Sequence, residues 1–149
     1  MFVTDGYNLR NTEFGAVLGL SQLPRLDNMI KKRREICKKF KSMLMNYANK
    51  FHIPNFKGNS SFCLPFILNN KSMKKDLQEY LEDNGIETRP LCSGNLLRQP
   101  FLKDYNLNLD NPKVDFLHFN GFFIGNNHLI TDDDIQKLER ILYEYFAIL

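Results

Sequence analysis

The chain has 149 residues and a mass of 17.5 kDa, which is the size of one ordinary domain and excludes a large multi-domain enzyme. Hydrophobic residues make up 43% and charged residues 25%, which excludes a chain that stays disordered. The formal net charge of +3 is too small to indicate, by itself, a nucleic-acid or membrane partner.

The first third of the chain is predicted to form two helices. Residues 11–23 form the first, because Asn11 or Thr12 can cap it and apolar residues recur along one side. Pro24 separates it from a longer helix over 26–49. Between Arg25 and Lys41 there are eight basic residues against two acidic ones, and apolar residues at helical spacing run through the same stretch. The basic residues therefore indicate the solvated face of a helix.

The rest of the chain alternates short strands with helices. The apolar run over 62–68 predicts a strand that is either interrupted at Pro65 or placed at a sheet edge because of it. Ser72 is expected to cap a helix that ends near residue 83, and residues 86–89 predict a second strand. After a loop over 91–111 come a short helix to about residue 119, a strand over 121–125 and a final helix that Thr131 opens. This order predicts an α+β domain with a sheet of about three strands covered by helices.

Cysteine and histidine patterns indicate neither a disulfide framework nor a metal site. The three cysteines contain no CxxC pair, and the three histidines lack metal-ligand spacing. We therefore expect a reducing, cytoplasmic setting. There is no signal-peptide pattern, and no apolar stretch approaches the ~20 residues that cross a bilayer. The short motifs with well-defined catalytic chemistry, such as the P-loop or GxSxG, are also absent from the sequence.

Four clusters combine turn-forming residues with side chains that bind anions or form hydrogen bonds. Gly6–Arg10 precedes a helix and is either a phosphate-binding loop or an ordinary capped entry loop. Arg89, at a strand end, either clamps a phosphate or pairs with Glu87 or Asp83. The third cluster is the polar loop 93–100, where Asn95 and Arg98 have no evident packing role. The fourth places His118 at the start of a strand, where a structural histidine is the common outcome.

In this order the clusters resemble the DegT/DnrJ/StrS family of pyridoxal-phosphate (PLP) sugar aminotransferases. The resemblance rests on Gly6-Tyr7-Asn8-Leu9-Arg10 and the helix after it, on Gly85–Pro90, and on Gly121–Asn126. It covers essentially all 149 residues, but only the C-terminal portion of the family. The loop with Gly94-Asn95-Leu96 is most similar to the NDP-4-keto-6-deoxyhexose 3-dehydrase branch, whose members use the cofactor as pyridoxamine phosphate.

The resemblance implies a fold, a set of partners and roles for six residues. The fold would be the small C-terminal domain of the aspartate aminotransferase fold over 25–149, with 1–24 as a loop and helix at the large-domain and dimer contact. Asn8 would hydrogen-bond the phosphate of the partner subunit's cofactor. The remaining candidates would line the cleft for a nucleotide-linked keto-deoxysugar; they are Arg10, Arg89, Asn95, Arg98 and His118. A homo-oligomer is expected, with no nucleic-acid or membrane partner.

The family's catalytic machinery has no counterpart in this sequence. The lysine or histidine of the cofactor site, and the aspartate that pairs with the pyridine nitrogen, lie upstream of the GYN segment in the family, and this chain begins almost at that segment. We therefore expect the chain alone to bind no cofactor and to be inactive. The resemblance implies that the full-length enzyme serves surface-polysaccharide (lipopolysaccharide, O-antigen) biosynthesis. The alternative is a stand-alone module of the same fold that binds a nucleotide sugar or another protein.

Overall fold

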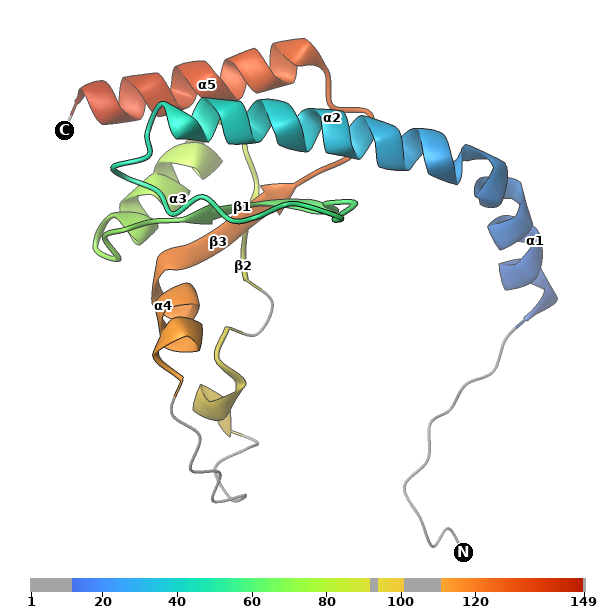
Figure 1. The fold of residues 1–149 in the computed structure, drawn as a ribbon, viewed down its shortest axis with the longest axis horizontal. Helices are drawn as coiled ribbons and strands as arrows, with labels where there is room; N and C mark the ends of the chain where they lie inside the picture. Colours follow the sequence, from blue (N-terminus) through green and yellow to red (C-terminus); the bar gives the residue numbers. More distant parts are fainter. Residues whose placement is uncertain (1–11, 92–93, 101–110, 149) are drawn as a thin grey trace, which may run out of the picture.

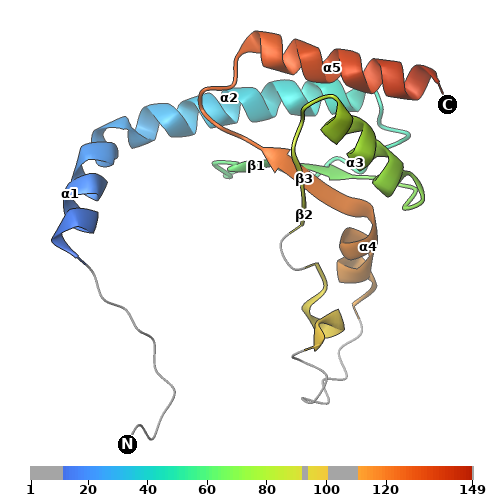
Figure 2. The same ribbon diagram turned by 180° about the vertical axis from the view of Figure 1, so that it is seen from behind.

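A computed structural model describes residues 12–91, 94–100 and 111–148 of the chain. They form the predicted α+β domain with a three-stranded sheet. The sheet is antiparallel, and helices pack on one of its faces. Helices α2 and α5 lie side by side over the sheet, and α3 packs near them (Figure 1). The view from behind shows α1 projecting away from the body and α4 beyond one end of the sheet (Figure 2).

The N-terminal helices follow the prediction closely. Helix α1 spans Glu13–Gln22, and the Oγ1 of Thr12 caps it by accepting a hydrogen bond from the amide of Gly15 at 3.2 Å. The 3-10 turn η1 (Leu23–Arg25) leads directly into α2 (Leu26–Met45). Helix α2 ends before the predicted residue 49, because the chain tightens into successive turns from residue 46 onward.

The sheet has the strand order β1-β3-β2, with β1 at Cys63–Ile67, β2 at Thr88–Pro90 and β3 at Gly121–Gly125. Strand β1, which contains Pro65, is an edge strand, which is one of the two predicted alternatives. Strand β2 begins two residues later than predicted. The cross-strand partners Leu64, Ile124 and Thr88 face the helices and are buried. The alternate positions, including Arg89 opposite Phe123, therefore share the other face.

Aromatic rings fill the core between the sheet and the helices. The ring of Phe66 stacks on Phe122 at 5.0 Å between centroids and meets Phe40 and Phe51 at 5.1 and 5.5 Å. All four side chains are almost fully buried. Two more helices, α3 (Met73–Asp83) and α5 (Asp132–Ala147), close this core.

Two helix starts differ in how they are capped. Thr131 and Asp134 form a reciprocal capping box at α5, as the sequence predicts. Ser72, expected to cap α3, makes no capping hydrogen bond. Its backbone is already helical, and the Oδ1 of Asn70 instead accepts from both the amide and the hydroxyl of Ser72, at 3.1 and 2.9 Å.

The apolar side of α1 has no cover among the described residues. Phe14 is 84% exposed, Val17, Leu18 and Leu20 are exposed to a similar degree, and α1 contributes no buried residue. The division of the chain at residues 24 and 25 stays a prediction, although η1 lies at that position.

Candidate functional site

The described residues include four of the six predicted site residues; Asn8 and Arg10 lie outside them. Three of the four come together at one end of the domain, where the 94–98 segment meets α4 (Pro112–Asn120). We call Asn95, Arg98, Asp115 and His118 the Asp115 cluster. The fourth, Arg89, lies on strand β2 and makes no hydrogen bond to this cluster in the described part of the chain.

Arg89 lies on the sheet face that the core helices leave open. Its cross-strand partner on β3 is Phe123. The ring of Phe123 packs edge-on against the exposed Phe62, with centroids 6.1 Å apart. The guanidinium forms an ion pair with Glu87, and both side chains are exposed. Pairing with Glu87 is one of the two alternatives that the sequence leaves open. Because the pair is solvated, its strength is small and an anionic ligand could compete for Arg89.

Asp115 holds the cluster together. Its Oδ1 accepts a hydrogen bond from the Nδ2 of Asn95 at 2.8 Å, and its two carboxylate oxygens accept from the Nε and a terminal nitrogen of Arg98 at 2.7 and 2.8 Å. The latter is a bidentate pair, which fixes the plane of the guanidinium. Arg98 also lies over the ring of Phe119, 4.8 Å from the centroid. Asn95 and Arg98 therefore have definite partners, contrary to the sequence interpretation that finds no packing role for them.

Asn95 organises its own loop as well. Only 6% of the residue is exposed, and its Oδ1 accepts from the amide of Leu97 at 3.0 Å, which caps the 3-10 turn η2 (Leu96–Arg98). Both ends of the side-chain amide are thus satisfied within the protein. The loop is therefore ordered by its own residues in this chain.

His118 is fixed by the backbone of the same loop. Its Nδ1 accepts a hydrogen bond from the amide of Asn95 at 3.1 Å. A neutral imidazole that accepts at Nδ1 carries its proton at Nε2, so Nε2 is a hydrogen-bond donor. Gly94 has a positive φ of 65°, and a Cβ there would lie 2.0 Å from the Nδ1 of His118. Only glycine permits both this backbone and this close approach.

Hydrogen bonds within the cluster stabilise the charged forms of Asp115 and Arg98. Hydrogen bonds from Arg98 first, and then from Asn95, hold the pKa of the Asp115 carboxyl well below its ordinary value, and the same contact raises the pKa of Arg98. Nearby, the Nζ of Lys74 donates to the carbonyl oxygen of His118 at 3.1 Å, and burial lowers the pKa of Lys74. The cluster thus carries an ionised Asp115 and a charged Arg98 at neutral pH.

Sequence reasoning missed Asp115, Phe119 and Lys74. For Asp115 a signal was present: it lies three residues before His118 in the short predicted helix, so the two side chains share one face. The partners Arg98 and Asn95 lie 17 and 20 residues away in the sequence, and no spacing rule connects them to Asp115. Lys74 reaches the site from α3, 44 residues from His118.

Within the described ranges, no group of three or more His, Cys, Asp or Glu residues is placed to hold a metal ion. Over the same ranges, none of the helices combines the length and the apolar character needed to span a bilayer.

The chain is similar to known sugar-modifying enzymes over almost its whole length. It is 33% identical over 147 residues to a GDP-4-keto-6-deoxy-D-mannose 3-dehydratase of Escherichia coli O55:H7, covering 95% of this chain and 38% of the relative. It is 27% identical over 150 residues to the lipopolysaccharide biosynthesis protein RfbH of Salmonella typhimurium, covering 96% of this chain and 34% of that protein. The chain thus spans little more than a third of these relatives.

Solved structures and a family model agree with these relatives. The E. coli GDP-4-keto-6-deoxy-D-mannose-3-dehydratase with bound hydrated PLP superposes with a TM-score of 0.82 at 30% identity, over 95% of this chain and 38% of that one. The superposition confirms the prediction that the chain has part of the PLP aminotransferase fold. The model of the DegT/DnrJ/EryC1/StrS aminotransferase family matches residues 3–142, and the chain belongs to this family.

Proposed function

We propose that this chain forms the small C-terminal domain of a PLP- or pyridoxamine-phosphate-dependent enzyme that modifies a nucleotide-linked keto-deoxysugar in surface-polysaccharide biosynthesis. The observation that carries the proposal is the match of 95% of the chain to one continuous third of a GDP-sugar 3-dehydratase, in both sequence and fold. In the proposed enzyme, Arg89 and the Asp115 cluster line the cleft that binds the sugar nucleotide.

The arrangement of the cluster supports this role. Arg98 is held in one plane by Asp115 and by the ring of Phe119, and Nε2 of His118 is available as a donor. Polar groups that are fixed before a ligand arrives lose little entropy on binding. Arg89 is exposed on the open sheet face and is held only by a solvated ion pair, so it suits an anionic group such as a nucleotide phosphate.

We propose that the described residues do not by themselves form a cofactor site. When bound, PLP or pyridoxamine phosphate supplies an electron sink, and it needs a lysine or histidine at its reactive carbon and an acid at its ring nitrogen. Asp115 is engaged by Arg98 and Asn95, and Lys74 is engaged by the carbonyl of His118. We therefore propose that the chain alone is inactive. From the family resemblance we also propose that Asn8 contacts the cofactor phosphate of a partner subunit in a homo-oligomer.

A chimera tests the proposal. Residues 12–149 of this chain replace the matching C-terminal segment of the E. coli GDP-4-keto-6-deoxy-D-mannose 3-dehydratase. We expect the chimera to show the absorbance of bound cofactor and to convert the GDP-linked keto sugar. In the chimera, Arg89→Gln is expected to raise KM for the sugar nucleotide. Arg140→Gln, which changes the same charge on the exposed side of α5, is the matched control and leaves KM unchanged.

Two results would contradict the proposal. The first is a folded chimera that binds the cofactor but has the same KM with and without Arg89. The second is tight binding of GDP-mannose by the isolated chain, measured by calorimetry, together with a chimera that does not turn over. This second outcome favours the alternative, a stand-alone nucleotide-sugar-binding module.

A further inference from the structure

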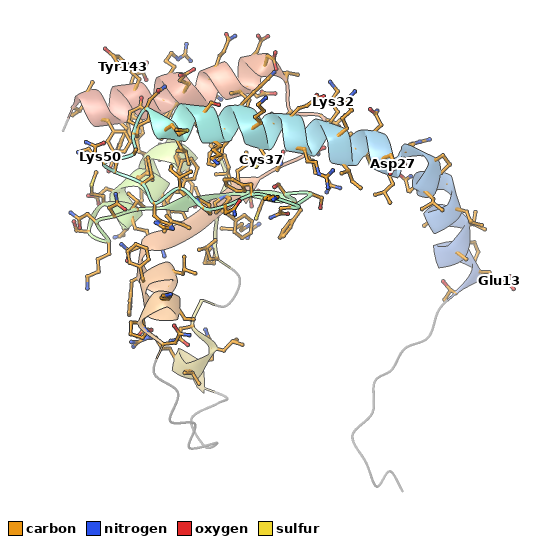
Figure 3. The ribbon with its side chains drawn as sticks, viewed as in Figure 1. Glu13, Asp27, Lys32, Cys37, Lys50 and Tyr143 are labelled. Carbon is orange, nitrogen blue, oxygen red and sulfur yellow. The ribbon has the colours of Figure 1, made fainter. Side chains whose placement is uncertain are left out.

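A cavity of about 440 Å³ lies between α2 and the loop that precedes β1. Its helix wall carries Arg34, Cys37, Lys38 and Lys41, and its loop wall runs from Phe56 to Ser61. Positions 34, 37, 38 and 41 are spaced i, i+3, i+4 and i+7, so their side chains leave α2 on one face. Cys37 is buried on the side of α2 that faces the sheet and this loop (Figure 3).

Three cations line this cavity and no carboxylate does. Among the described residues, Lys38 and Lys41 form no ion pair, and Arg34 uses only its Nε, which donates to the carbonyl oxygen of Asn59 at 3.2 Å. The terminal nitrogens of Arg34 have no partner in the described part of the chain. Like charges at i, i+3 and i+4 on an exposed helix face repel each other weakly, and an anion bound among them would remove this repulsion.

The neighbouring groove on the other side of Lys38 lacks this imbalance. It lies between α2 and α5, where Lys38 and Lys39 face Glu35, Asp132 and Glu139. Lys39 forms an ion pair with Asp132. The positive charge of α2 is therefore balanced by carboxylates on the side toward α5, which Lys38 also lines, whereas no carboxylate lines the side toward the loop. The excess of positive charge belongs to the cavity rather than to the whole helix.

The loop wall is held in place. The Oδ1 of Asn59 accepts from the amide of Ser61 at 2.7 Å, and the Nδ2 of Asn126 donates to the carbonyl oxygen of Ser61 at 2.6 Å. Asn126 is 4% exposed and also donates to the carbonyl oxygen of Arg33 at 3.0 Å, which joins the loop to α2. The cavity is thus formed by fixed backbone on one side and a rigid helix on the other.

From the charge, size and fixed walls we infer that the cavity between α2 and residues 56–61 binds a diphosphate group. A diphosphate carries more charge than one phosphate and can contact three cations spaced over two helical turns. The volume lies within the range of small-molecule sites. The diphosphate could be free or part of a nucleotide, because Phe56 offers an aromatic surface beside the cations.

Inorganic pyrophosphate, titrated into the full chain at constant ionic strength, tests the inference. Backbone amide NMR shifts are expected within 34–41 and 56–61, and the melting temperature is expected to rise. In Lys38→Gln/Lys41→Gln the dissociation constant is expected to increase about tenfold or more. The matched control Lys31→Gln/Lys137→Gln removes the same charge from exposed positions that do not line the cavity and leaves the constant within about twofold.

The ligand's source is distinguished by two further probes. GDP that binds like pyrophosphate indicates that only the diphosphate is bound, and GDP that binds more tightly at the same amides indicates a nucleotide. The inference is overturned by the absence of shifts within 34–41 and 56–61, by equal losses in both double variants, or by guanosine shifting these amides as strongly as GDP does. Binding at the sugar-nucleotide cleft proposed above would instead shift the amides of strand β2 around Arg89, so the two sites are told apart by which amides respond.

Discussion

Replacing Gly94 with alanine tests whether the Asp115 cluster depends on close contact between the loop and α4. The backbone at Gly94 is left-handed, which costs about 1–2 kcal/mol for an alanine. The new Cβ would also lie 2.0 Å from the Nδ1 and 2.9 Å from the Cε1 of His118, so the imidazole must move. Moving it breaks the bond from the amide of Asn95, which contributes about 1 kcal/mol and leaves a donor in a buried residue without its partner. We expect a total loss of about 2–4 kcal/mol.

Gly58→Ala is the matched control, because Gly58 has φ of 77° but a Cβ added there would meet no atom within 4 Å. It should cost only the backbone contribution, about 1–2 kcal/mol. Unfolding in urea can be followed by circular dichroism and by the fluorescence of the six tyrosines, since the chain has no tryptophan. The difference between the two variants is then the cost of displacing His118.

A double-mutant cycle gives the decisive comparison. In the His118→Ala background the imidazole is absent, so Gly94→Ala should cost about the same as Gly58→Ala. The expected coupling free energy between positions 94 and 118 is therefore about 1–2 kcal/mol. Equal costs of Gly94→Ala in the two backgrounds would refute the argument, because they would mean that the loop does not rest on His118.

Three other substitutions have defined outcomes. Asp115→Asn should reduce stability at pH 7, and the difference from the unmodified chain should shrink as the pH falls below about 4. The reason is that the lowered pKa of Asp115 stabilises the folded chain at pH values above the ordinary pKa of aspartate, and this stabilisation is lost as the carboxylate is protonated. Urea unfolding of both chains at pH 3 and pH 7 measures the difference. Phe66→Ala should cost about 3–5 kcal/mol, because it empties the centre of the aromatic core, and calorimetry would show the lower melting temperature. Thr131→Ala should cost about 1 kcal/mol through loss of the capping box at α5, with Thr131→Ser restoring most of it; a loss unaffected by serine would contradict this.

The elements can be predicted because their signals are local. Thr131, Pro65 and the glycines of β3 mark their elements by chemistry within a few residues, and all three predictions are confirmed. The predicted capping of α3 is wrong for an equally local reason. Asn70 and Ser72 compete for the same backbone groups, and composition alone does not decide which side chain turns toward the chain.

The Asp115 cluster can be predicted only in part because its members come from two separate segments, the 94–98 loop and α4. Asn95, Arg98 and His118 can be named from a family resemblance, but their mutual contacts cannot. The contacts depend on Asp115, whose carboxylate joins two loop residues to a helix once the fold has placed them together. The left-handed backbone of Gly94 shows the same limit: a glycine in a loop is common, and only the position of His118 explains why this one is required.

The pairing of Arg98 changes what that side chain can contribute to binding. Asp115 neutralises its charge at short range and takes up its Nε and one terminal nitrogen, and the ring of Phe119 covers one face of the guanidinium. A phosphate would have to approach an ionised carboxylate to reach it, which electrostatic repulsion opposes. The remaining terminal nitrogen suits a neutral acceptor, such as a sugar hydroxyl or carbonyl oxygen. In the cleft that we propose, Arg89, whose partner Glu87 is solvated, would then be the better phosphate ligand of the two arginines. Arg98→Lys in the chimera is therefore expected to alter sugar discrimination more than nucleotide affinity.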